Sequence, residues 1–401
     1  MTTPSHPSPV AVVTPWYPGA DHAFRGAFVR AMVDATGPGT DMTVYHCEEW
    51  GHRLDGGPIE AAYQSLLSRT HRPPHAIPTA GGARLIHTPV PLTVSPGYAA
   101  IGRRHAETLS AVLDGKPLPA PVVHAHVGLQ GGWGALRNKA PDARLFVTEH
   151  ATFLGGVLAQ PEAKEMYDEL LTRCAGFFAV GAAVSDPLIK AFPHHRDKIQ
   201  LMPNPVSFDV RRPKPVTELR RWLYVGSLTE RKGVRWVLEA FARCRAEDET
   251  LELTLVGDGE LRRPLGAKVQ ELGLSDAVTF LGLQPPDRAL DLMREHDLLV
   301  HNSRFETFGM TIVEASAAGM PVLVTRCGGP EETLAGIEED AGEMIDVEEA
   351  SDALVAGFRR LRDRFPDKID LGRARHRLES RYGYAATAEA HHRAWFGDTD
   401  D

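Results

Sequence analysis

Residues 301–332 read HNSRFETFGMTIVEASAAGMPVLVTRCGGPEE. A short apolar run, Asp297–Val300, precedes this stretch, and a second, Pro321–Thr325, lies inside it. Both runs have the length and composition of buried strands. The residues between them carry an apolar face at helical spacing, which Gly319 and Pro321 bring to an end. The stretch therefore predicts a strand, a helix and a strand in succession, the repeating unit of a parallel α/β sheet.

The start of the predicted helix, near Phe308, Gly309 and Met310, is suited to bind an anion. The first N–H groups of a helix have no partner within it, and the helix dipole is positive at that end. A glycine at this point lets a ligand approach the backbone closely. We therefore expect a phosphate group at this junction.

Two carboxylates flank the same glycine. Glu306 lies on the loop before the helix, and Glu314 follows eight positions later, after the first helical turn. At that spacing both can point into one cleft and accept hydrogen bonds from hydroxyl groups of a sugar and a ribose. Taken singly, a glutamate in a helix or on a loop is usually a solvated surface residue, so the functional interpretation depends on the pattern around the two.

The pattern around these residues resembles a known signature. The stretch contains Glu-x7-Glu with Phe-Gly after the first Glu, then Glu-Ala, Gly-x-Pro-Val and Gly-Gly-x-x-Glu. It resembles the nucleotide-sugar signature of the family 4 retaining glycosyltransferases, also called glycosyl transferases group 1. The resemblance implies the α/β fold named GT-B, with two Rossmann-like, doubly wound domains facing each other across a cleft.

The resemblance also assigns roles within the C-terminal, donor-binding domain. Glu306 would contact the transferred sugar, and Glu314 would hold the ribose. Phe308, Gly309 and Met310 would present their N–H groups to the sugar or the phosphate.

A second motif, Gly226–Gly233, follows a predicted strand and contains the adjacent cations Arg231 and Lys232. The resemblance implies that this pair neutralises the diphosphate leaving group. Many relatives carry an arginine where this chain has Ser227, which puts one phosphate contact in doubt. Standing alone, the pair would be read as solvated side chains beyond a turn.

The first domain offers Gly26 and His150 as candidates. Gly26 stands at the start of a predicted helix, after the strand Pro9–Thr14, and is read equally as a donor-binding glycine or as a packing glycine. His150 follows the strand Ala143–Thr148, at the edge where open α/β sheets bind ligands. It matches the cleft histidine of the family, and the alternative is a structural histidine.

Two further pairs of residues lie at predicted strands. His124 and His126 form a His-x-His pair that projects both rings to one face of a strand. No further ligand has suitable spacing, so we expect no metal there. The family resemblance, in which a His-x-His pair commonly ends this strand beside the cleft, implies a structural or acceptor-side role. Residues 278–284 resemble the strand and loop that border the nucleotide base in the family, which implies Leu283 and Gln284 as candidates for contacts with the base.

Length and composition bound the remaining possibilities. A chain of 401 residues suits two domains, which we place at 1–207, binding the acceptor, and 208–381, binding the donor, with a final helix at 382–401 packing back on the first. The net charge of −9 argues against nucleic-acid binding. No apolar run is long enough to insert in a membrane, and no signal segment is evident, so we expect a cytoplasmic protein.

The sequence thus predicts a glycosyltransferase that moves a sugar from a nucleotide diphosphate sugar, on family grounds a UDP-sugar, with retention of configuration. We expect no cofactor or metal. The acceptor is predicted to be a small soluble hydroxylated molecule, such as an aminocyclitol or sugar of antibiotic biosynthesis, because the chain is acidic and Pro58–Arg72 holds only two cations. The alternatives are a GT-B epimerase or phosphorylase and a non-catalytic partner subunit that binds nucleotide-sugar. The oligomeric state is not indicated.

Overall fold

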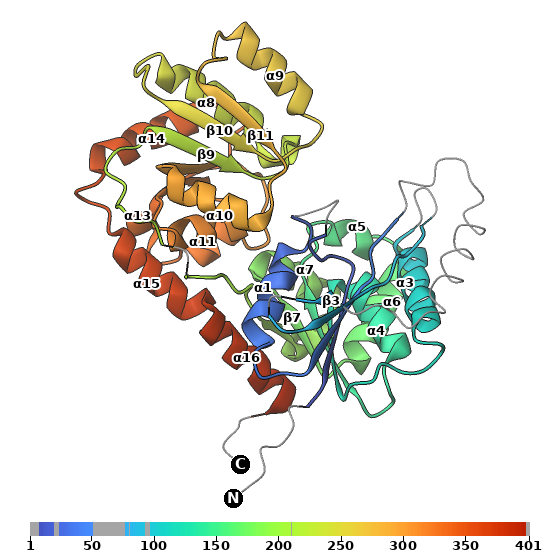
Figure 1. Cartoon of the computed structure of the whole chain (residues 1–401). Coiled ribbons are helices and arrows are strands. Elements are labelled where there is room, and N and C mark those ends of the chain that lie inside the picture. Colours follow the sequence, from blue (N-terminus) through green and yellow to red (C-terminus); the bar gives the residue numbers. More distant parts are fainter. Residues whose placement is uncertain are drawn as a thin grey trace, which may run out of the picture. The chain divides into compact units, whose positions relative to one another are not determined.

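The computed structural model describes residues 8–19, 24–50, 77–79, 81–92, 97–209 and 211–397. The predicted acceptor-side segment at Pro58–Arg72 lies outside these residues. The chain divides into two compact units, and Figure 1 shows in each a twisted sheet with helices packed around it. The N-terminal unit holds the described residues of Met1–Pro18, Arg25–Pro203 and Thr387–Asp401, and the C-terminal unit those of Gly19–Phe24 and Asn204–Ala386.

The N-terminal unit is built on an eight-stranded sheet of order β3-β4-β2-β1-β5-β6-β7-β8. All its pairs are parallel except β3 with β4. The strands are β1 (Val10–Thr14), β2 (Met42–His46), β3 (Ile77–Pro78), β4 (Arg84–His87), β5 (Val122–His126), β6 (Arg144–Glu149), β7 (Gly176–Ala179) and β8 (Ile199–Leu201). The strand order reverses between β1 and β5, so the ligand crevice of this sheet is expected at their carboxyl ends.

Helices cover both faces of this sheet, which is why central strands such as β1 and β5 are buried along their whole length. They are α1 (Ala27–Thr36), α3 (Tyr98–Val112), the π-helix η1 (Val127–Gly132), α4 (Trp133–Asn138), α5 (Leu154–Leu158), α6 (Pro161–Arg173), α7 (Ala182–Ala191), the 3₁₀ helix η2 (Pro193–Lys198) and α16 (Tyr384–Phe396). Trp395 of α16 is fully buried in the core of this unit.

The C-terminal unit has a six-stranded sheet of order β11-β10-β9-β12-β13-β14, with every pair parallel. Its strands are β9 (Arg221–Val225), β10 (Glu252–Val256), β11 (Val278–Gly282), β12 (Leu298–His301), β13 (Val322–Thr325) and β14 (Gly342–Ile345). The order reverses between β9 and β12, so the ligand crevice of this sheet is expected at the carboxyl ends of these two strands.

The helices of the C-terminal unit pack a core around Trp222, Phe241 and Phe358. They are η3 (Glu230–Lys232), α8 (Val234–Arg245), α9 (Arg262–Glu271), α10 (Pro286–Glu295), α11 (Met310–Ala317), α12 (Gly329–Thr333), α13 (Glu338–Ala341), α14 (Asp352–Arg364) and α15 (Leu371–Tyr382). The predicted strand, helix and strand of residues 297–325 are confirmed as β12, α11 and β13.

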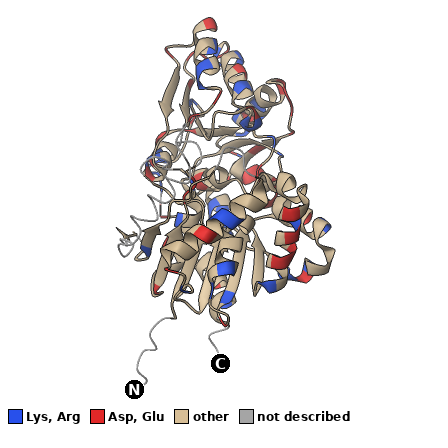
Figure 2. Ribbon diagram, turned by 90° about the vertical axis from the view of Figure 1, so that its right-hand side faces the viewer, with Lys and Arg blue, Asp and Glu red and all other residues tan. Residues whose placement is uncertain are grey.

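The charged side chains lie mainly outside the sheets. Figure 2 shows the acidic and basic residues mostly on helices and loops, while the strands are mostly free of them. Among the helices that the structure describes, none is both long and apolar enough to cross a bilayer.

Candidate active site

The loop between β12 and α11 forms the centre of the site. Gly309 ends it with a left-handed backbone (φ 88°) and begins α11. The N–H groups of Phe308, Gly309 and Met310 donate no hydrogen bond to another described residue. Three donors at the positive end of a helix are a ready anion site.

Gly328 and Gly329, the double glycine of the signature, pack against this loop and fix its backbone. A Cβ on Gly329 would lie 2.7 Å from the backbone nitrogen of Phe308, so only glycine fits. The main chain of Glu306 is bonded on both sides, its N–H donating to the Cys327 carbonyl (3.0 Å) and its carbonyl accepting from the Gly329 N–H (2.9 Å). The glycines therefore hold Glu306 in one place.

Lys232 and Glu306 meet beyond the carboxyl ends of β9 and β12. Lys232 Nζ lies 2.5 Å from Glu306 Oε1, and their side chains are only 15% and 11% exposed. Burial by itself would raise the pKa of Glu306, but the charge of Lys232 and then His301 outweigh it and lower the pKa to about 2. The carboxylate is therefore charged at neutral pH.

The pair forms because two loops touch. Gly233 has a left-handed backbone (φ 62°), and a Cβ there would lie 2.0 Å from the carbonyl oxygen of Asn302. Because β9 and β12 are neighbours in the sheet, this close approach places Lys232, which follows β9, beside Glu306, which follows β12.

Arg231 is placed differently from Lys232. Its guanidinium donates to the Phe305 carbonyl at 2.7 Å, and its own carbonyl accepts from the Arg304 N–H at 2.9 Å. Arg231 therefore braces the loop that carries Glu306, while its side chain remains exposed. Ser227 is also exposed, directly after β9.

His301 was not predicted. Its Nε2 lies 3.6 Å from Glu306 Oε1, and its Nδ1 is buried without a partner among the described residues. Burial, more than the opposing charge of Glu306, lowers the pKa of His301 to about 4, so the ring is neutral at pH 7. Its position directly after the predicted strand Asp297–Val300, five residues before Glu306, is the sequence signal that could have identified it.

Glu314 lies in α11, eight residues beyond Glu306, and is partly buried. Its carboxylate makes no hydrogen bond or ion pair with a described residue. Burial raises the pKa of Glu314 to about 7. A desolvated carboxyl without a partner has free capacity for a hydroxyl donor.

Leu283 and Gln284 follow β11 at the same carboxyl edge of the sheet. The Leu283 side chain is 55% exposed. The Gln284 amide donates to the Leu281 carbonyl at 2.7 Å, which orders the loop. Both stand two strands from β9, farther from Lys232 than the residues of the β12 loop.

Gly26 begins α1 with φ 77°, and a Cβ there would lie 2.3 Å from the carbonyl of Trp16. This close approach of two backbone segments accounts for the glycine by packing. A contact with the donor stays a prediction.

His150 stands at the carboxyl end of β6, in the N-terminal unit. It is stacked on Phe28 (4.2 Å between ring centres), and its Nε2 lies 2.9 Å from His126 Nδ1. Burial, and then the neighbouring His124, lowers the pKa of His150 to about 3. His150 Nδ1 and His126 Nε2 are buried without partners in the described chain, so this pair keeps polar atoms free at a strand end.

His124 has a structural role. The Trp395 indole N–H donates to His124 Nδ1 at 2.9 Å, so the ring proton sits on Nε2 and is donated to Thr148 Oγ1 at 2.7 Å. The two rings of the His-x-His pair do stack on one face, 4.9 Å apart. One ring anchors α16, and the other faces His150.

Comparison with known proteins covers both units. The model of the family described as Glycosyltransferase Family 4 matches residues 60–210, and that described as Glycosyl transferases group 1 matches residues 208–368. The chain is 27% identical to a D-inositol 3-phosphate glycosyltransferase of Nocardia farcinica over 302 residues, 68% of this chain and 65% of that protein. It is 31% identical to a mannosylfructose-phosphate synthase of Agrobacterium fabrum over 165 residues, 36% of each chain. The chain thus spans less than two thirds of the length of these relatives.

Solved structures agree on the fold. A sucrose-phosphate synthase from Thermosynechococcus elongatus superposes with a TM-score of 0.68 at 20% identity, covering 96% of this chain and 97% of that one. The Anabaena protein HepE, solved in complex with UDP and glucose, gives 0.63 at 17% identity, covering 96% and 98%. The predicted GT-B fold of two Rossmann-like domains is therefore confirmed. With two family models matched in succession on this fold, the chain belongs to the family 4 glycosyltransferases of group 1.

Proposed function

We propose that this protein transfers a sugar from a UDP-sugar to a small soluble hydroxylated acceptor, with retention of the anomeric configuration. The observation that carries the proposal is the pairing of Lys232 with Glu306 beside the unpaired N–H groups at Gly309. One cation, one carboxylate and a helix start are what a sugar bound through a diphosphate requires.

The diphosphate would bind at the start of α11, where the N–H groups of Gly309 and Met310 meet its oxygens. Lys232 would stabilise the negative charge that develops on the diphosphate as the bond between sugar and phosphate breaks. This lowers the activation barrier because the cation is already in place. Glu306 would accept hydrogen bonds from hydroxyl groups of the transferred sugar, and Glu314 from the ribose. Positioning and charge stabilisation supply the catalysis, so we name no enzyme nucleophile.

His150 belongs to the acceptor side of the proposal. Its ring is neutral, and its Nδ1 carries no partner in the described chain. A neutral imidazole can donate to or accept from a hydroxyl group, depending on which nitrogen of the His126–His150 pair holds the shared proton.

Two kinds of relatives support the choice of substrates. HepE was solved with UDP and glucose, which favours a UDP-sugar. The names D-inositol 3-phosphate glycosyltransferase and mannosylfructose-phosphate synthase favour a small polyhydroxylated acceptor, here an aminocyclitol or sugar of the kind used in antibiotic biosynthesis. We further propose that the protein acts in the cytoplasm and needs no metal for turnover, because Lys232 supplies the positive charge.

The proposal is tested by a thermal-shift screen of nucleotide-sugars, since a ligand of the native state raises the melting temperature. We expect UDP-sugars to stabilise the protein more than other nucleotide-sugars. Turnover of the best donor in excess EDTA should equal turnover without it. Conversion of the sugar while it remains attached to the nucleotide would instead identify an epimerase, and binding without any turnover would identify a non-catalytic subunit.

A further inference from the structure

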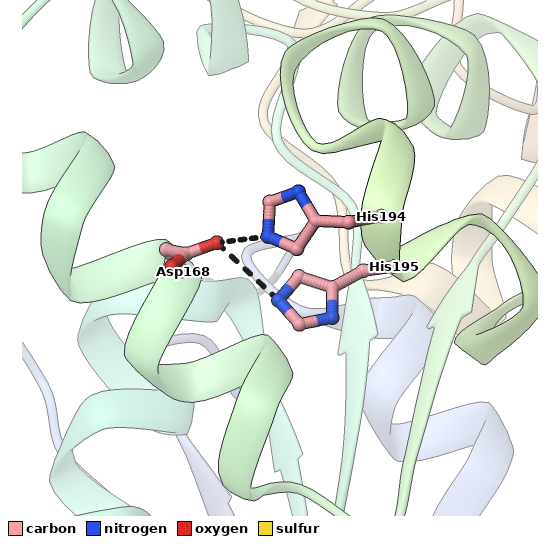
Figure 3. A group of neighbouring side chains, drawn as sticks. All are labelled: Asp168, His194 and His195. Carbon is pink, nitrogen blue, oxygen red and sulfur yellow. Dashed lines mark hydrogen bonds and ion pairs between the residues drawn. The ribbon is translucent and has the colours of Figure 1, made fainter.

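Three side chains that carry possible metal ligands lie close together in the N-terminal unit (Figure 3). Asp168 lies in α6, and His194 and His195 lie in η2. His194 Nε2 is 2.8 Å from Asp168 Oδ1, and His195 Nε2 is 3.3 Å from the same oxygen. Within the described ranges, this is the one group of three such residues whose ligand atoms all lie within 4.8 Å of one another.

These separations suit a common ion. Zinc binds imidazole nitrogen and carboxylate oxygen at about 2.0 to 2.2 Å, so two of its tetrahedral ligands stand about 3.3 Å apart. The separation between His195 and Asp168 already has this value. His194 would move outward by a few tenths of an ångström, and its side chain is free to do so because it is 60% exposed.

The two imidazole rings lie next to each other, with 4.2 Å between ring centres. Imidazole nitrogen is the commonest metal ligand among side chains, and the His195 side chain is only 12% exposed, which limits its freedom to turn away.

The frame of the group is held without an ion. Lys198 Nζ donates to the carbonyls of Leu171 (2.7 Å), Thr172 (3.0 Å) and Cys174 (3.1 Å), which ties η2 to the end of α6. Ligands that converge on a rigid frame lose little freedom when an ion binds.

We propose that Asp168, His194 and His195 form a binding site for a divalent transition-metal ion of the zinc type, with water completing the coordination. Two imidazoles and one carboxylate are a donor set that zinc accepts. The residues of η2 precede β8, so the site lies at the amino edge of the sheet, whereas His150 follows the carboxyl end of β6. The ion would therefore join α6 to η2 and take no part in catalysis. The inference is independent of the proposed function.

The test is calorimetric titration of zinc chloride into the full chain after EDTA treatment and its removal. We expect one ion per chain for the wild type, and at least tenfold weaker binding for Asp168→Asn and for His194→Gln. His87→Gln is the matched control, because His87 and Glu48 form a surface pair at the same 2.8 Å with no third ligand among the residues that the structure describes. Its zinc affinity should equal that of the wild type.

A second measurement separates a site from general surface binding. Zinc should raise the melting temperature of the wild type and of His87→Gln, with reversal by EDTA, and should leave Asp168→Asn and His194→Gln unshifted. Equal zinc affinity in all four proteins, or no stoichiometric binding in the wild type, would overturn the proposal. Loss of donor turnover in EDTA would contradict the structural role of the ion.

Discussion

Lys232 Nζ and Glu306 Oε1 lie 2.5 Å apart, although the two residues come from loops that follow different strands, β9 and β12. Both side chains are largely buried. A diphosphate at the start of α11 would compete for Lys232, and a sugar hydroxyl would compete for Glu306. Under the proposed function, the pair would thus be a preformed site in which substrate groups replace an internal contact.

Lys232→Met should lower both stability and turnover. The change leaves a buried carboxylate without its cation, which costs about 3 kcal/mol of unfolding free energy. It also removes the charge that meets the leaving group, so kcat should fall by at least about 100-fold.

The double variant Lys232→Met with Glu306→Gln separates the two effects. Urea unfolding should show that the second change restores most of the lost stability, because no unpaired charge remains. Turnover should stay low. Recovery of turnover together with stability would show that the pair is structural only.

Arg231→Ala should reduce kcat/KM by about tenfold, an effect of about 1.4 kcal/mol. Arg231 holds the carbonyl of Phe305, so its loss loosens the loop that carries Glu306. Arg235→Ala is the matched control, because that exposed arginine pairs with Glu230 on the same connection. Steady-state kinetics should show no change for the control, and a loss of folding in proportion to the loss of rate would assign Arg231 a structural role.

Glu314→Gln should weaken UDP-sugar binding by about 10- to 100-fold, since a ribose diol loses a charged acceptor worth about 1.5 to 3 kcal/mol. Isothermal titration would measure this. Glu348→Gln, an exposed glutamate of the same unit, should bind the donor like the wild type. Unchanged affinity in Glu314→Gln would remove this residue from the site.

The same variant tests the pKa of Glu314. The folded pKa is about 7, above the ordinary 4.5, so the folded state holds the proton more tightly than the unfolded state. Glu314 therefore makes the wild type lose stability as pH rises from 4.5 to 7. Glu314→Gln removes this pH dependence. The free energy of unfolding of the variant, relative to that of the wild type, should therefore be higher at pH 8 than at pH 5. The opposite trend would contradict the assignment.

Thr148→Val should destabilise the protein by about 1 to 3 kcal/mol, because it leaves the buried His124 Nε2–H without an acceptor. The Trp395 indole occupies the other ring nitrogen, so His124 cannot turn its proton elsewhere. Thr43→Val, on β2 of the same sheet, is the control and should unfold like the wild type. Donor affinity should be unchanged in both, and a smaller cost for Thr148→Val than for the control would contradict the network.

The sequence predicted local structure where one stretch contains all of its determinants. Residues 297–325 form β12, α11 and β13 as expected, because apolar runs, a glycine start and a Gly-Met-Pro stop act over a few residues. The fold class followed from the same signature.

Contacts made across the sheet could not be predicted in this way. Lys232 and Glu306 are 74 residues apart and meet only because β9 and β12 are neighbours. The packing of Gly26 on Trp16 likewise depends on a tertiary approach that spacing does not reveal. His194 and His195 carried no motif, because their third partner, Asp168, lies in another helix.

The central claim is tested most directly by following the reaction with NMR, using UDP-sugars, a set of small polyol and aminocyclitol acceptors, and either the wild type or Lys232→Met. The account predicts that the wild type forms UDP and a glycoside in equal amounts, with the donor's anomeric configuration kept. Lys232→Met should form both at least about 100-fold more slowly. Absence of nucleotide release with every donor, an inverted glycoside, or an equal rate in the variant would contradict it.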